Sequence, residues 1–128
     1  MQILAALFID DIEVRQVPGP STRIDLRGIG FSFPAPQPVP VTTEPHLVVL
    51  MHNSESTAAL GALEVVYQRG EEQVARNVQP VEIEAGKFSY RLVRAELEFE
   101  DYGTVEAHCR VDMGPTIVVP YTLLEPVE

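Results

Sequence analysis

The sequence predicts an all-β fold, an antiparallel β-sandwich of seven to eight short strands. Apolar segments are short and recur roughly every ten residues between turn residues, which is typical of sandwiches and barrels. None of these segments keeps a 3.6-residue period over three turns, as an amphipathic helix would. The chain has 128 residues, of which 45% are hydrophobic. That is the size and composition of one globular domain, so residues 1–128 are expected to form a single sandwich.

The first half of the chain supplies three of these strands. Residues 3–9 are apolar at every position, which indicates a strand with both faces covered. Residues 23–33 begin with a regular alternation that places Ile24 and Leu26 on one face. The glycines at 28 and 30 predict a bulge or bend, and the apolar positions are expected to continue at Ile29, Phe31 and Phe33. Residues 46–52 are the most apolar run and are predicted to form a central strand.

A polar loop follows this central strand at residues 53–57, and one helical turn is expected at 58–60. The alternation then resumes at 62–69, which predicts a further strand. A turn at 70–72 leads into a weaker strand around 73–78.

The segment from Phe88 to Phe99 changes its apolar parity part-way. Phe88, Tyr90 and Leu92 lie on one face of an extended chain, and the apolar positions then switch to Val93, Ala95, Leu97 and Phe99. A one-residue slip reverses every side chain of a strand. We therefore expect either a bulge near 92–93 or a crossing to a new element there.

The last two strands are clearly patterned. Residues 104–111 place Val105, Ala107, Cys109 and Val111 on the inward face. Residues 116–124 form the final strand, and Pro120 cannot donate a hydrogen bond to a ladder. This strand is therefore predicted to lie at a sheet edge, or to carry a bulge at Pro120.

Residues 34–45 hold five of the eleven prolines and favour extended polyproline II. The simplest interpretation is a stiff connector that crosses from one sheet to the other. The alternative is an arm that lies on a neighbouring subunit. The residues proposed to bind a partner are those exposed by this segment and by the edge strand: Pro34, Pro36, Pro38, Pro40, Pro120 and Tyr121.

Charge narrows the classes of partner. Nine basic residues stand against nineteen acidic ones, for a net charge of −10. This balance argues against nucleic acid and against an anionic membrane surface. No apolar run approaches the roughly 20 residues that span a bilayer, so membrane insertion is not expected. Because the first nine residues lack the basic flank of a signal peptide and Cys109 is the only cysteine, a cytoplasmic location is expected.

The residues that carry chemistry do not assemble into a known site. His108 and Cys109 are adjacent, so on a strand they project to opposite faces. His46 and His52 share a strand face but stand roughly 20 Å apart, too far to chelate one ion. Three acidic pairs, 10–11, 71–72 and 100–101, lack the glycine-bearing loop typical of calcium sites. No catalytic residue, metal site or cofactor is predicted.

Two resemblances add to this interpretation. Residues 101–109 resemble the Asp-x-Gly-x-Tyr-x-Cys entry to the sixth strand of immunoglobulin-like sandwiches, with Asp101 and Gly103 in place. Val105 and Ala107 replace the Tyr and Cys, so the resemblance implies the topology without its corner hydrogen bond or disulfide. Residues 6–14 and 26–30, with the proline-rich crossing and the acidic hairpin, resemble an uncharacterised family of short bacterial sandwich proteins that has no assigned activity.

These observations favour a non-catalytic interaction module that acts as a subunit or accessory protein of a larger assembly. Its contacts are expected to be edge strands and the proline-rich segment, and its partner a protein, including a further copy of the chain. The alternative is a module that binds a carbohydrate or headgroup in loops at one end of the sandwich. An enzyme would need a cleft that joins His46 or His108 to carboxylates distant in sequence.

Overall fold

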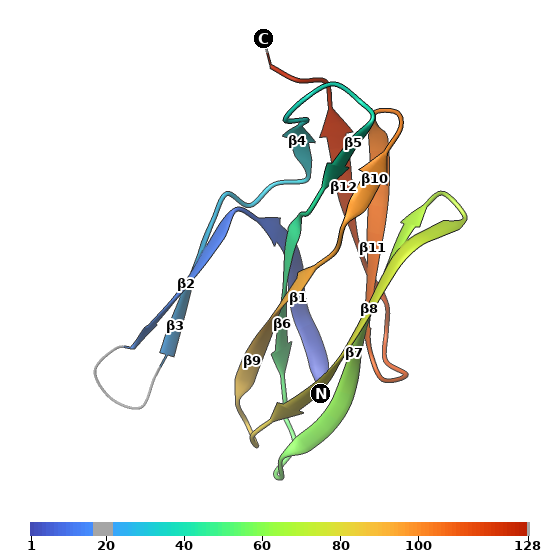
Figure 1. Cartoon of the computed structure of the whole chain (residues 1–128). Helices are drawn as coiled ribbons and strands as arrows, with labels where there is room; N and C mark the ends of the chain where they lie inside the picture. Colours follow the sequence, from blue (N-terminus) through green and yellow to red (C-terminus); the bar gives the residue numbers. More distant parts are fainter. Residues whose placement is uncertain (17–21, 128) are drawn as a thin grey trace.

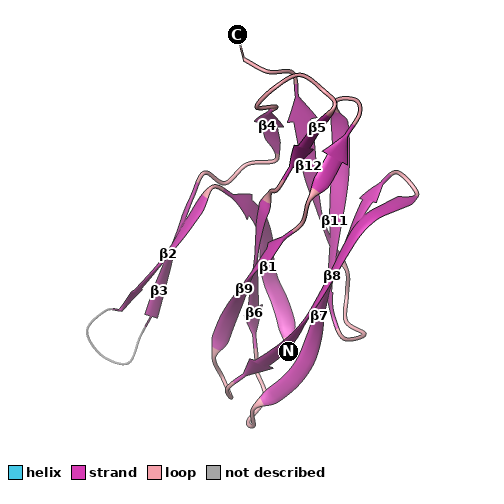
Figure 2. Cartoon of the chain, viewed as in Figure 1, coloured by secondary structure: helices cyan, strands magenta, loops and turns pink. Residues whose placement is uncertain are grey.

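A computed structural model describes residues 1–16 and 22–127, and it shows two sheets that face each other and one hairpin that leaves them (Figures 1 and 2). The all-β prediction is confirmed, because every regular element in this part of the chain is a strand. The strands are β1 (Gln2–Ile9), β2 (Asp11–Gln16), β3 (Thr22–Arg27), β4 (Ser32–Pro34), β5 (Val41–Thr43), β6 (His46–His52), β7 (Ala59–Arg69), β8 (Glu72–Ile83), β9 (Phe88–Arg94), β10 (Leu97–Phe99), β11 (Gly103–Val111) and β12 (Ile117–Leu124).

The first sheet has the order β1-β6-β9, so residues 46–52 form its central strand as predicted. It continues into the two-stranded ladder of β5 and β10 without a change of register, since Thr43 lies opposite Leu97 and His46 opposite Arg94. The ladder is interrupted at Pro45, which has no N–H to donate. One pair of long strands is thereby divided into four short ones, which partly explains why the strands outnumber those predicted.

The second sheet has the order β4-β12-β11-β7-β8. Strand β7 begins at Ala59, which lies opposite Ile83 of β8, and Leu60 lies opposite Glu82. The helical turn expected at 58–60 is therefore wrong: long-range pairing with β8 takes these residues into the sheet. The strand predicted at 73–78 is correct but longer, because its pairing with β7 continues to Ile83.

The core lies between the two sheets. From the first sheet it takes Phe8, Leu47, Val49, Met51 and Val93, and from the second it takes Leu63, Val65, Tyr67, Val105, Ala107, Cys109 and Leu123. Positions 105, 107, 109 and 111 of β11 all face inward as the sequence predicted. None of the described residues forms a helix long and apolar enough to cross a membrane.

The bulge or crossing expected near residues 92–93 is absent. Strand β9 pairs with β6 in one unbroken register from Phe88 to Arg94. Val93 faces the core, and the chain extends its inward face through Leu97 and Phe99. The strand is therefore apolar on both faces: Val93 faces the core, and Tyr90 and Leu92 lie on the opposite face.

The proline-rich segment crosses between the sheets of its own chain. Its first residue, Pro34, ends β4 beside β12, and its last part forms β5 beside β10. Ala35 N–H donates to the Leu124 carbonyl at 2.9 Å, and Val39 N–H donates to the Tyr102 hydroxyl at 3.4 Å. The structure thus supports the interpretation of residues 34–45 as a connector between the two sheets, rather than as a segment that lies on a neighbouring subunit.

Candidate interaction site

The most distinctive feature outside the sandwich is the hairpin of β2 and β3, which projects away from both sheets (Figure 1). We call residues 11–16 and 22–27 the arm. Its register places Ile12 opposite Leu26 and Val14 opposite Ile24, so these side chains share one face. None of the four belongs to the core or packs against it. The arm is thus an amphipathic ribbon whose apolar face lies outside the core, with Val14 exposed and Ile12, Ile24 and Leu26 partly exposed.

The opposite face of the arm is charged and internally paired. Arg27 Nη2 lies 2.7 Å from Glu13 Oε2, and Arg15 Nε lies 2.5 Å from Asp25 Oδ2. These pairs are largely exposed, so each contributes roughly 0.2–1 kcal/mol. They orient the charged face to solvent and leave the apolar face as the available contact surface.

The root of the arm is held by backbone hydrogen bonds and a close approach at Gly28. Asp10 N–H donates to the Arg27 carbonyl at 2.9 Å, and Gly30 N–H donates to the Phe8 carbonyl at 3.1 Å. Gly28 has φ +69°, and a Cβ added there would clash with the carboxylate of Asp10. The predicted bend at the glycines is therefore present. The expected continuation of the apolar face is wrong at Ile29 and Phe31, which leave the strand and are exposed, whereas Phe33 packs against the core.

A second apolar surface lies on the outside of the first sheet. Val48 is buried but is not part of the core cluster, because it faces away from the second sheet. Leu7 of β1 and Leu92 of β9 lie opposite Val48 on either side of it. Tyr90 lies opposite Leu50, which is two residues further along β6. We call this surface the outer sheet face; its members are Ala5, Leu7, Val48, Leu50, Phe88, Tyr90 and Leu92.

The residues predicted to bind a partner lie in different environments. Pro34, Pro36, Pro38 and Pro40 are exposed on the crossing segment. The prediction that the last strand lies at a sheet edge is wrong for β12 as a whole, because β4 lies outside it at residues 122–124. Pro120 itself pairs with Glu106 of β11 in an unbroken register, and β4 does not extend to it. Tyr121 is only 6% exposed and stacks on Phe33 with ring centroids 5.0 Å apart, so its side chain belongs to the interior. Binding by the prolines stays a prediction.

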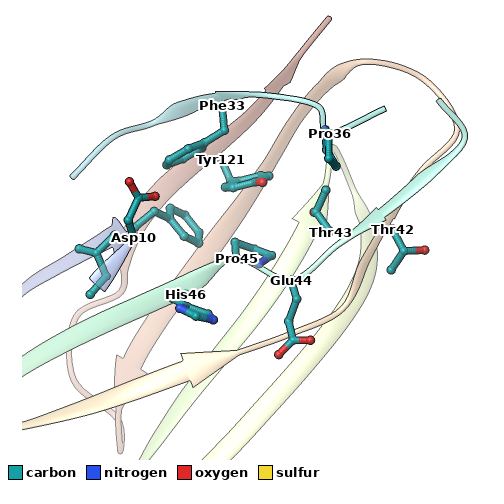
Figure 3. A pocket seen from close by; sticks show the side chains of 11 residues that line it. Asp10, Phe33, Pro36, Thr42, Thr43, Glu44, Pro45, His46 and Tyr121 are labelled. Carbon is teal, nitrogen blue, oxygen red and sulfur yellow. The ribbon is translucent and has the colours of Figure 1, made fainter. Parts of the chain in front are cut away.

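One cavity of about 380 Å³ opens beside Tyr121 and is drawn in Figure 3. It brings His46 together with Asp10, which is distant in sequence, and with Glu44. Among the described residues, however, no hydrogen bond joins His46 to either carboxylate, so no base and orienting partner are aligned. Thr43 Oγ1 also lies here, buried without a hydrogen-bond partner of ordinary geometry. Burial raises the pKa of Tyr121, an effect that the nearby Thr43 hydroxyl partly offsets.

Cys109 has the environment of a core residue. Its side chain is fully buried, and burial raises the pKa of the thiol to about 12. His108 lies on the opposite face, where its Nε2 is 3.6 Å from Glu106 Oε1. The interpretation of Cys109 as a small buried apolar residue is confirmed, and His108 does not approach its sulfur along the strand.

Two of the acidic pairs do converge. Glu72 and Glu100 line one groove at the β7–β8 turn, together with Glu96 and Glu98. Arg69 occupies the same groove, donating to the Glu98 carbonyl at 2.5 Å with its guanidinium 5.1 Å from the centroid of Phe99. This cation already neutralises part of the acidic charge. Within residues 1–16 and 22–127, no group of three or more His, Cys, Asp or Glu side chains is placed to hold a metal ion.

Comparison with known proteins supports the fold alone. No family model and no curated protein matches the chain. A similar solved structure is described as that of a novel β-glucosidase, EmGH1, from Erythrobacter marinus, with a TM-score of 0.52 and 11% sequence identity. The match covers 94% of this chain but 15% of that one. The similarity therefore extends over a part of that protein about the size of this sandwich.

Proposed function

We propose that this chain is a non-catalytic interaction module, a subunit or accessory part of a larger assembly. The observation that supports it best is the arm, a two-stranded ribbon whose apolar face does not pack against the core of the described chain. An isolated hairpin of two strands is marginally stable in water, so a projecting ribbon of this kind gains from a partner. The matched part of the β-glucosidase is likewise a small share of a longer protein.

This proposal changes the contact surface that the sequence suggested. The prolines of residues 34–45 are engaged in crossing between sheets, so the arm replaces them as the principal contact. The immunoglobulin-like topology, the resemblance to a bacterial family and a cytoplasmic location remain predictions from the sequence.

Site-specific thiol labelling tests the proposal. Cys109 is buried and inert, so a single cysteine introduced as Val14→Cys reports on the arm alone. Val118→Cys on the outside of the second sheet is the matched control, since Val14 is 46% and Val118 45% exposed. We expect maleimide to label both positions equally in the dilute purified chain, and to label Val14→Cys much more slowly in extracts of the source cells. Equal labelling of the two positions in the extract would contradict the proposal.

The cavity beside Tyr121 favours a second candidate function, the binding of a small ligand. Its volume of about 380 Å³ and its aromatic residues Phe8, Phe33 and Tyr121 match ordinary ligand pockets. A thermal-shift panel of saccharides and headgroup analogues tests it, with His46→Ala as the variant expected to abolish any shift. A panel without any shift, or a shift that His46→Ala retains, would count against this candidate.

A further inference from the structure

We propose that two copies of this chain form a dimer by exchanging arms, with the apolar face of each arm packed on the outer sheet face of the other copy. The inference rests on the proposed function, because it takes the arm as the contact surface and names the partner. Two apolar surfaces that lie outside the core cluster carry it: Ile12, Val14, Ile24 and Leu26 on the arm, where Val14 is 46% exposed, and the strip around Leu92 and Phe88 on the sheet, where Phe88 is 43% exposed.

The two surfaces match in size and kind. Strand β2 has six residues and β6 has seven, so each extends about 20–23 Å at about 3.3 Å per residue. A two-stranded ribbon laid on a three-stranded sheet is an ordinary sheet-on-sheet contact, in which aliphatic and aromatic side chains of the two faces interdigitate. The arm presents four aliphatic side chains, and the outer sheet face presents leucines with Tyr90 and Phe88.

The distribution of charge selects these faces for a contact between copies. The chain carries a net charge of −10, which opposes association through most of its surface. Strands β1, β6 and β9 nevertheless contain no Asp or Glu. Arg94 lies opposite His46 at one end of the outer sheet face, and His52 lies at the other end. The outer sheet face therefore carries no acidic side chain that would repel a second acidic copy, whereas the groove with Glu72, Glu98 and Glu100 would repel it.

The root of the arm directs it away from its own sheet. Hydrogen bonds from Asp10 N–H and Gly30 N–H hold both ends of the hairpin, and the side chain of Asp10 occupies the space beside Gly28. Since only Asp10 separates β1 from β2, the arm leaves from the edge strand of the very sheet that receives the other arm. A twofold axis near this edge lets both arms cross at once. The reciprocal contact closes the assembly at two copies, whereas a one-way contact would propagate into a filament.

The oligomeric state tests this arrangement with three substitutions at positions of matched exposure: Val14 at 46%, Phe88 at 43% and Val118 at 45%. Val14→Asp alters the arm, Phe88→Glu alters the outer sheet face, and Val118→Asp is the control on the other sheet. Sedimentation equilibrium should give twice the chain mass of 14.2 kDa for the wild type and for Val118→Asp. Val14→Asp and Phe88→Glu each change both contacts of the dimer, so each should raise its Kd at least about a hundredfold, tenfold per contact.

Mixing the two defective variants tests which surface meets which. A Val14→Asp copy keeps an intact sheet face and a Phe88→Glu copy keeps an intact arm, so an equimolar mixture should form a one-to-one complex. Each variant alone should remain monomeric at the same concentration. Circular dichroism and the melting temperature of each variant confirm that it is folded.

Three results would overturn the inference: a wild-type chain that stays monomeric at millimolar concentration, dimers of Val14→Asp as stable as those of the wild type, or a mixture that does not associate. Failure here is distinguishable from failure of the proposed function. A monomeric chain whose Val14→Cys variant is still protected in extracts would remove the second copy as the partner and leave the arm as the contact surface.

Discussion

Cys109 shows at the scale of one residue how burial decides what a reactive group can do. Burial raises the pKa of its thiol from 9.0 to about 12, so at neutral pH the folded chain holds it as a neutral thiol. The unfolded chain loses this proton as the pH passes about 9, but the folded chain keeps it until about 12. Between these values the unfolded state binds fewer protons, so stability falls as the pH rises, by up to about 1.4 kcal/mol per pH unit.

We therefore expect Cys109→Ala to lose less stability than the wild type between pH 9 and pH 11. Urea unfolding at each pH measures this difference, and Ala107 on the same face shows that the strand accepts alanine. Burial also raises the pKa of Tyr67, so part of the alkaline loss should persist in the variant. Identical pH profiles for the two proteins would show that the thiol does not contribute.

Asn53 is a fully buried polar residue that holds four backbone groups at one end of the sandwich. Its Nδ2 donates to the carbonyls of Thr57 and Ile83, both at 2.9 Å, and to that of Glu84 at 3.4 Å, and its Oδ1 accepts from Glu55 N–H at 3.0 Å. Asn53→Ala would remove all four bonds, and we expect a loss of about 2–4 kcal/mol in the free energy of unfolding. Ser54→Ala at the neighbouring exposed position should change it by less than about 0.5 kcal/mol. Equal effects from the two substitutions would contradict the role assigned to Asn53.

At the scale of elements, the alternation of residues predicted which side chains share a strand face, but it did not predict what packs against each face. The alternation that places Ile24 and Leu26 together is correct, yet that face lies on the projecting arm and not in the core. The apolar runs of both parities around Val93 suggested a bulge or a crossing, whereas the strand keeps an unbroken register and is apolar on both faces. A period of two residues reports which side chains share a face. It carries no information on what packs against that face.

The arm should therefore be separable from the fold. Asp11 lies opposite Arg27 at its base, so residues 12–26 can be replaced by a two-residue Asn-Gly turn. Because none of Ile12, Val14, Ile24 and Leu26 packs against the core, we expect cooperative unfolding with a melting temperature within about 5 °C of the wild type. Calorimetry measures both properties. A broad or strongly lowered transition would mean that the arm supports the sandwich, which would weaken its assignment as a contact surface.

At the scale of the whole molecule, the core was easier to predict than the surfaces on which a function depends. The inward positions of β11 followed from alternation alone, because one buried face must be apolar along its whole length. The outer sheet face and the cavity beside His46 join residues that are far apart in sequence, such as Leu7 with Leu92 and Asp10 with Thr43. Such surfaces depend on sheet order, and no local pattern specifies that order.

The net charge of the whole molecule predicts how its self-association depends on salt concentration. Each copy carries −10, so two copies repel each other across their surfaces even where the contacting faces are apolar and weakly basic. Raising NaCl from about 20 to 300 mM shortens the Debye length from roughly 20 Å to below 8 Å and screens this repulsion, while apolar burial is retained. The dimer should therefore tighten several-fold, as sedimentation velocity at matched concentrations would show.

The Val118→Asp control adds one further negative charge outside the contact, so its dimer should be slightly weaker at low salt and should converge with the wild type at high salt. A dimer that loosens as salt is added would instead be held by opposite charges, and the arm and the outer sheet face would not be its contact.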